Sequence, residues 1–181
     1  GDLRITASES VLVDQSSDVD FEINTDARGV GGDLIITAPT ITILDGTSLE
    51  TEVDGHGSVG SIILTASDRV LIDDSELQGE IDERGRGISG QVAITAPIVT
   101  LQNGTVLEAK VDDNAVGDGG TVMIAADQVT IRDSTLSLDT DSGAVGNGGV
   151  LQVQARTIEI TDGARISTST AARGNAGSMV L

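Results

Sequence analysis

A glycine-led segment recurs along the whole chain at a nearly constant interval. The copies read G-D-L-R-I-T-A, G-D-L-I-I-T-A, G-S-I-I-L-T-A, G-Q-V-A-I-T-A, G-T-V-M-I-A-A and G-V-L-Q-V-Q-A. They begin at residues 1, 32, 60, 90, 120 and 149, and a seventh begins at 177, so the period is 28 to 31 residues. Units of this length bury their apolar side chains by stacking on their neighbours. The repeat therefore predicts a solenoid of six coils.

Each copy carries the pattern of a strand with one buried face. The second and fourth residues after the glycine are aliphatic in every copy. This alternation has the period of two that a half-buried β-strand requires. The sixth residue is always alanine, which predicts an inside corner with little room for a larger side chain. This alanine column comprises Ala7, Ala38, Ala66, Ala96, Ala126 and Ala155.

Two further strands are expected in each copy. The second centres on an aliphatic column formed by Leu12, Ile43, Leu71, Leu101, Ile131 and Ile160. Two residues later comes an acid or its amide, which favours a sharp turn, at Asp14, Asp45, Asp73, Asn103, Asp133 and Asp162. The third strand centres on Val19, Leu49, Leu77, Leu107, Leu136 and Ile166. A loop rich in glycine and aspartate then leads to the next copy.

Three short strands and three corners in about 29 residues describe one coil of a parallel β-helix. We therefore predict an all-β fold, a parallel β-helix (β-solenoid) with three strands per coil and six coils. Residues 1–181 are expected to form a single segment of a longer repeat array. An antiparallel sandwich of hairpins is the competing fold, but it does not naturally produce aliphatic columns at a fixed period.

The charge of the chain bounds its partners. Ten basic residues stand against 29 acidic ones, which gives a net charge of −19. A surface this negative repels phosphate backbones and anionic lipid headgroups, so we expect no nucleic acid partner. No run of 18 apolar residues occurs, so we expect no membrane insertion. The chain has no cysteine, which excludes disulfides and thiolate metal sites.

The last full copy resembles a known family of repeats. Its string T-I-E-I-T-D-G-A-R-I-S, residues 157–167, ends in G-N-A-G at residues 174–177. This combination resembles the repeat region of filamentous-haemagglutinin-like exoproteins of the two-partner secretion type, particularly the large cyanobacterial ones. The resemblance implies a right-handed β-helix, export across the outer membrane and a secreted or cell-surface location. It implies no catalytic residue, and the family's amino-terminal secretion domain has no counterpart here.

The expected function is that of a structural or adhesive module in an extracellular fibrous protein, and not that of an enzyme. Unpaired strand edges at the ends of a solenoid invite further strands. The expected partners are therefore other copies of the chain or adjoining coils of a longer one, with filaments growing by end-to-end stacking. A surface or matrix polysaccharide is a further expected partner.

A carbohydrate-active β-helix is the alternative function. One stretch concentrates ionisable side chains that could perform acid–base chemistry on a sugar: Asp73, Asp74, Glu76, Glu80, Asp82, Glu83, Arg84 and Arg86. The chain has no Trp or Tyr to form a sugar platform, so a solvated edge is the simpler interpretation. His56 is the only histidine, and we interpret it as an exposed loop residue.

No cofactor is expected, and calcium is the only metal that the composition brings into question. The loop at 112–120 offers aspartate and asparagine oxygens, which calcium prefers. It does not match the G-G-x-G-x-D calcium repeat, and turn formation accounts for its residues.

One column of the first strand should point outward and yet is apolar. It contains Ile35, Ile63, Ala93 and Met123, the third residues after successive glycines. An exposed apolar stripe commonly marks a contact surface, so these four residues form our predicted contact face.

Overall fold

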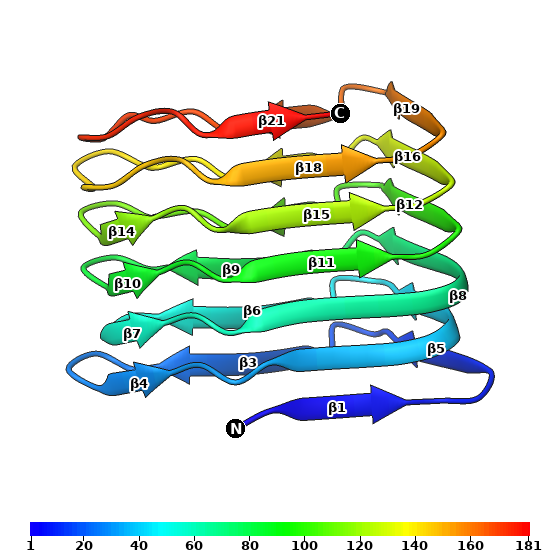
Figure 1. Ribbon diagram of the computed structural model, residues 1–181. Helices are drawn as coiled ribbons and strands as arrows, with labels where there is room; N and C mark the ends of the chain where they lie inside the picture. Colours follow the sequence, from blue (N-terminus) through cyan, green and yellow to red (C-terminus); the bar gives the residue numbers. More distant parts are fainter.

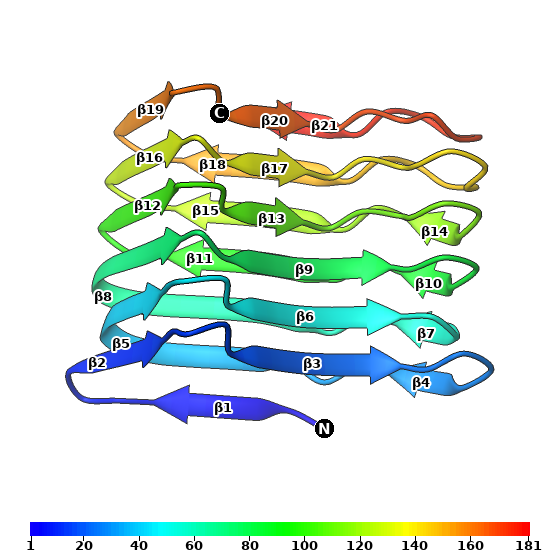
Figure 2. The ribbon, with the colours of Figure 1, turned by 180° about the vertical axis from the view of Figure 1, so that it is seen from behind.

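The computed structural model covers residues 1–181 and consists entirely of β-strands, turns and loops. Its 21 strands pair in parallel and stack into a solenoid of about six coils, with the N-terminus at one end and the C-terminus at the other (Figure 1). The near strands run from left to right, and the chain returns behind them as it rises (Figures 1 and 2). The coil is therefore right-handed, and the predicted parallel β-helix is confirmed.

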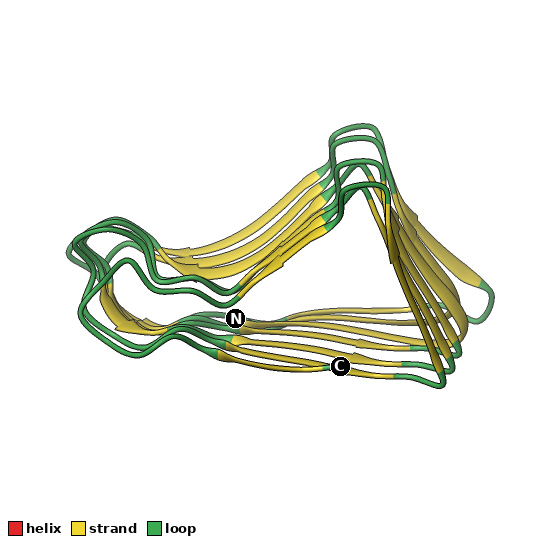
Figure 3. Cartoon of the chain, turned by 90° about the horizontal axis from the view of Figure 1, so that it is seen from above, coloured by secondary structure: helices red, strands yellow, loops and turns green.

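Three sheets run along the solenoid axis. Sheet A has 11 strands and forms the two long sides of the wide part of the coil in Figure 3. Its first side contains β1 (Leu3–Thr6), β11 (Gln91–Thr95), β15 (Thr121–Ala125), β18 (Val150–Gln154) and β21 (Ser178–Val180). Its second side contains β2 (Ser10–Val13), β12 (Ile98–Gln102), β16 (Gln128–Arg132) and β19 (Thr157–Thr161). Two long strands turn the corner and belong to both sides, β5 (Leu34–Ile43) and β8 (Ser61–Asp73).

Sheets B and C enclose a narrow lobe at the opposite end of each coil from this corner (Figures 1 and 3). Sheet B contains β3 (Asp18–Ile23), β6 (Ser48–Val53), β9 (Glu76–Ile81), β13 (Val106–Glu108), β17 (Thr135–Ser137) and β20 (Arg165–Ser167). Sheet C contains β4 (Arg28–Val30), β7 (His56–Ser58), β10 (Arg86–Ile88) and β14 (Val116–Asp118). Sheet C adds a fourth short strand to the first four coils, within the segment that we predicted to be a loop.

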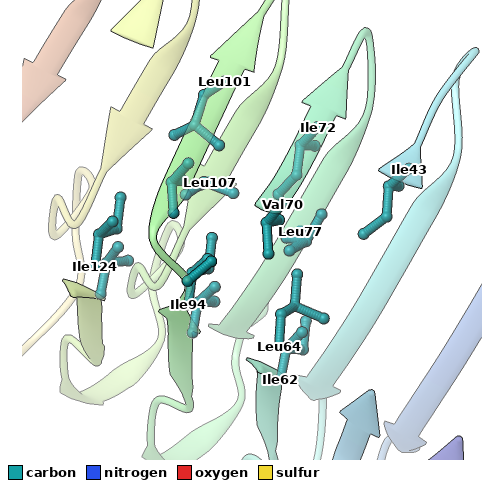
Figure 4. Close-up of a cluster of buried hydrophobic side chains, with 14 of the residues drawn as sticks. Ile43, Ile62, Leu64, Val70, Ile72, Leu77, Ile94, Leu101, Leu107 and Ile124 are labelled. Carbon is teal, nitrogen blue, oxygen red and sulfur yellow. The ribbon is translucent and has the colours of Figure 1, made fainter. Parts of the chain in front are cut away.

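Aliphatic columns form the core, as expected for stacked coils. The main cluster has 27 buried residues, which come from the inner faces of sheets A and B. Figure 4 shows their side chains following one another from coil to coil, for example Leu64, Ile94 and Ile124. A second cluster of seven buried residues fills the narrow lobe: Ile23, Val53, Val59, Ile81, Val111, Ala115 and Ala144. The first- and third-strand columns are confirmed by the strand register.

The second-strand column was wrong in two coils. Ile43 pairs with Ile72, and in the first coil it pairs with Val13. The predicted members Leu12 and Leu71 lie on the outer face, and Leu12 is 59 % exposed. The physical reason is one extra residue between the corner alanine and the second strand in coils one and three, which moves each following side chain to the other face.

The turn after the second strand shifts with that register. Positive φ angles occur at Asp45, Asn103, Asp133 and Asp162, as the turn chemistry predicts. In coil three the positive φ belongs to Asp74 (47°) instead of the predicted Asp73. In coil one it belongs to Gln15 (59°) and Ser16 (55°) instead of Asp14.

Thr140 places a hydroxyl in the core of the narrow lobe. Thr140 is fully buried, and its Oγ1 has no hydrogen-bond partner. It continues the aliphatic column of Ile81 and Val111, and Thr170 follows it in the next coil. A buried polar group without a partner costs about 1–3 kcal/mol.

We therefore expect Thr140→Val to raise the free energy of unfolding by about 1 kcal/mol, measured by urea denaturation. Thr105→Val is the matched control, because Thr105 is equally buried but its Oγ1 lies 2.8 Å from the carbonyl oxygen of Gln102. That variant should lose stability. A loss in both variants would show that the Thr140 hydroxyl has a partner after all.

Candidate functional site

The predicted cluster of eight ionisable residues does not converge on one site. Asp73 and Asp74 lie at the turn before sheet B, and Glu76 and Glu80 lie along β9. Asp82, Glu83 and Arg84 follow in the loop at the tip of the narrow lobe, and Arg86 begins β10 on sheet C. Four residues along a strand span about 13 Å, so Glu76 and Glu80 stand farther apart than a glycosidase carboxylate pair, which is typically about 5–10 Å.

The structure instead brings together acids from neighbouring coils on the outer face of sheet B. Glu22, Glu52 and Glu80 are register partners in coils one, two and three. Asp20 and Glu50 form a second register pair, two residues earlier in the same two strands and on the same face. These residues are about 30 positions apart in the sequence, so an inspection of local stretches misses them. A search for acids at multiples of the repeat period would have found them.

Asp20, Glu22 and Glu52 form the tightest acidic group. Ligand oxygens of all three lie within 4.8 Å of one another. Burial raises the pKa of Glu52 to about 7, with Asp20, Asp82, Glu50 and Asp54 adding repulsion. Burial and neighbouring acids also raise the pKa of Asp20. Three carboxylates at this spacing could hold a hard cation such as calcium through oxygen ligands.

Lys110 lies at the centre of the same face. Its Nζ is 2.9 Å from Glu108 Oε2 and 3.6 Å from Glu80 Oε2. Burial raises the pKa of Glu80 to about 8 despite the attraction of Lys110. Burial alone would lower the pKa of Lys110, but Glu80 and Glu108 outweigh it and raise that pKa. The ammonium group therefore stays charged and holds the acids of coils three and four together.

In coils five and six, hydroxyl groups compensate the acid that follows Glu80 and Lys110 on the outer face of sheet B. Asp139 Oδ1 accepts hydrogen bonds from the Ser167 hydroxyl at 2.6 Å and from both the backbone N–H and the hydroxyl of Ser169. Burial would raise the pKa of Asp139, but these bonds favour the carboxylate and lower it. The acids on the outer face of sheet B therefore have no basic partner in coils one and two, whereas Lys110 and hydroxyl groups compensate acids farther up.

Two shallow hollows accompany these acids. One of about 160 Å³ lies beside the turn ladder and is lined by residues that include Gly46, Asp74, Glu76 and Gly104. A second lies at the tip of the narrow lobe and is lined only by polar residues, among them Asp54, Asp82 and Arg84. The second hollow gathers carboxylates from coils two, three and four, and burial together with the neighbouring Asp82 raises the pKa of Asp54.

The other predicted positions fall on separate surfaces. Ile35, Ile63, Ala93 and Met123 are register partners on the outer face of sheet A, and Met123 is 38 % exposed. Their role as a contact face stays a prediction. The loop at 112–120, which we considered for calcium, contributes no residue to the group formed by Asp20, Glu22 and Glu52. That group lies on sheet B. His56 is exposed, as predicted, but it begins strand β7 rather than lying in a loop.

The raised glutamate pKa values predict a stability that falls with rising pH. The folded chain binds protons more tightly than the unfolded chain, in which glutamate titrates near 4.5. This stabilisation is complete below about pH 4.5 and is lost as the pH rises through the folded pKa values of about 7 and 8. A tenfold change in proton affinity corresponds to about 1.4 kcal/mol, and solvent screens the partly exposed Glu52. The more deeply buried Glu80 should therefore account for most of a loss of a few kcal/mol between about pH 5 and pH 9.

Urea denaturation across this pH range measures how steeply the free energy of unfolding falls with pH. Glu80→Gln, which cannot titrate, should flatten it. Glu9→Gln, an exposed acid of the first coil, is the control that should leave the slope unchanged. If Glu80→Gln left the pH dependence of stability unaltered, the raised pKa of Glu80 would not be its cause.

The fold defines the chain as a parallel β-solenoid repeat protein. No helix in it is long and apolar enough to cross a membrane. Comparison with protein-family models, with curated proteins and with solved structures finds no match.

Proposed function

We propose that residues 1–181 form a structural and adhesive module of a secreted or cell-surface fibrous protein. In such a protein the coils would act as a stiff spacer that holds cells to a surface, to a matrix or to one another. The resemblance of residues 157–167 and 174–177 to filamentous-haemagglutinin-like repeats supports this role. The observation that carries the proposal is the continuity of the ladder, since the strands of each inner coil pair with those of the coil above and the coil below.

A ladder of this kind suits a spacer for a physical reason. Each coil contacts only its neighbours, so stability grows with the number of coils and the length of the rod is set by their count. Sheet A continues through all six coils, and its core columns stay aliphatic throughout. A rod of six coils at about 4.8 Å each spans roughly 30 Å.

Attachment of the producing cells tests the role. Deletion of residues 1–181 from the protein that contains them should reduce cell–cell or cell–surface attachment, measured by counting adherent cells under flow. A deletion mutant that attaches as well as its parent would contradict the proposal. The enzymatic alternative has its own test, incubation of the chain with acidic polysaccharides. Turnover that Asp73→Ala or Asp82→Ala abolishes would replace the structural role with a catalytic one.

End-to-end stacking is a more specific form of the same proposal. The end coils expose side chains of the core columns, for example Leu3 at 37 % and Ile160 at 41 %, whereas Leu34 in the second coil is 1 % exposed. Adjoining coils, or another copy stacked end to end, would cover them. Electron microscopy of the segment at high concentration should show fibres that lengthen along the solenoid axis. A solution that contains only single short rods would contradict this form.

A further inference from the structure

Three basic side chains stack on the outer face of sheet C without partners. Arg28, His56 and Arg86 are register partners in β4, β7 and β10, in coils one to three. Neighbouring strands place them about 4.8 Å apart. All three are exposed, and none forms a side-chain hydrogen bond or a salt bridge within the chain. We call these three residues the basic ladder, and no acidic side chain of the chain compensates them.

Exposed apolar side chains flank the basic ladder. Val30 and Ile88 follow Arg28 and Arg86 by two positions, so they point to the same face of sheet C. They are 78 % and 63 % exposed, more than any other large hydrophobic residue of the chain. Open ends do not explain Ile88, because β10 lies between β7 and β14. This face is therefore unusual in two independent ways.

Coils one and two also carry acids that have no basic partner. Asp20, Glu22, Glu50 and Glu52 lie on the outer face of sheet B in coils one and two and form no salt bridge. We call these four residues the acid ladder, and Glu76 continues their face in coil three. Burial, with repulsion from neighbouring acids, raises the pKa values of Asp20 and Glu52.

We propose that the basic ladder of one copy docks against the acid ladder of a second copy, with their axes parallel and their coils level. The two ladders rise by the same step, so Arg28 and His56 would meet the acidic rungs of coils one and two, and Arg86 would meet Glu76 in coil three. A second copy necessarily presents charges at this spacing. Val30 and Ile88 would pack on the methylene groups of the glutamate side chains.

This contact joins two different surfaces, so it can add copies indefinitely and does not end at a dimer. Sheet C is on the side of the narrow lobe that faces the viewer in Figure 1, and sheet B is on the side seen from behind (Figure 2). A docked pair thus leaves one basic ladder and one acid ladder free, which is a heterologous contact that adds further copies. The result is side-by-side bundling of solenoids. It goes beyond the proposed spacer role, which holds for a single rod.

The net charge of −19 shapes the salt dependence of the contact. At very low salt the two copies repel each other over long distances. At about 0.15 M the screening length is about 8 Å, so distant charges contribute little while pairs in contact persist. At about 1 M the pairs are screened as well. Association should therefore be strongest at intermediate salt.

Sedimentation velocity over a range of concentrations tests the docking. At about 0.15 M salt the apparent mass of the unaltered chain should rise with concentration. Arg28→Gln/Arg86→Gln and Glu22→Gln/Glu52→Gln should each abolish that rise. An equal mixture of the two variants should form a one-to-one complex and nothing larger, because only one complementary pair of ladders remains. Arg4→Gln/Arg69→Gln removes two exposed arginines from sheet A and should associate like the unaltered chain.

Several outcomes would overturn the docking. A chain that stays monomeric at every salt concentration has no such contact. Association that neither ladder variant changes belongs to the open ends, and this result leaves end-to-end stacking intact. Retention of the unaltered monomer, but not of Arg28→Gln/Arg86→Gln, on an immobilised polyuronate would assign the basic ladder to an acidic polysaccharide instead.

Discussion

Replacing Gly87 with alanine is expected to destabilise the chain by about 3 kcal/mol, the upper range for forcing extra atoms into a packed interior. A Cβ at this position would overlap the carbonyl oxygen of Gly57 in the coil below. The overlapping atoms are backbone atoms of Gly57, so no side chain can rotate to relieve the overlap. Neighbouring coils would have to separate, which weakens the hydrogen bonds of sheet C.

Gly29 supplies the matched control. It occupies the same column as Gly87 in the first coil, and its added Cβ would meet only Ile23 Cδ1 at 3.9 Å, an ordinary contact. Gly29→Ala should therefore leave the urea midpoint nearly unchanged. Hydrogen exchange of the β10 amides should accelerate only in Gly87→Ala. Equal losses in the two variants would show that overlap between coils is not the cause.

Truncation of Ile72 is the second large expected effect. Ile72 is fully buried among the aliphatic columns of sheet A, so Ile72→Ala should cost about 3 kcal/mol through lost burial and the cavity left behind. Leu71 is adjacent in sequence but lies on the outer face. Leu71→Ala should cost less than about 1 kcal/mol.

Thermal and urea denaturation of both variants measure the difference. The comparison is sharp because the two substitutions remove the same number of atoms from neighbouring positions of one strand. If Leu71→Ala were the more damaging, the column predicted from a fixed sequence offset would be right and the register of β8 would be wrong.

The repeat period was sufficient to predict the solenoid but not every residue of its core. The first strand was predictable because the distance from the leading glycine to the corner alanine never varies. The second strand was not, because coils one and three hold an additional corner residue. From Ala38 to Ile43 is five steps, whereas from Ala66 to Ile72 is six. Leu71 and Ile72 are both aliphatic, so composition could not choose between them.

Sheet C escaped prediction for a different reason. Its strands have a central glycine and no inward aliphatic column, as in Arg28-Gly29-Val30 and Arg86-Gly87-Ile88. Strand propensity is low for glycine, so these triplets resemble a loop. The recurrence of glycine at one phase of the repeat was the available signal. It indicates that successive coils approach too closely there for any side chain.

The acidic site shows the limit of interpretation by sequence neighbourhood. Residues close in sequence, such as Asp74 and Asp82, are spread along one coil, whereas Glu22 and Glu52 meet across two coils. In a solenoid, residues one repeat period apart in the sequence are neighbours in space. Burial also could not be inferred from the residue type, and burial is what raises the pKa of Glu52 and Glu80.

The confinement of contacts to adjacent coils has an evolutionary consequence. A duplication or loss of about 29 residues adds or removes one coil, and the new junction is a surface that the protein already makes everywhere else. Such a change alters the reach of the rod by about 4.8 Å without redesigning a core. Length can therefore drift by whole units in a lineage, while any surface that spans three coils, such as the basic ladder, is inherited or broken as a block.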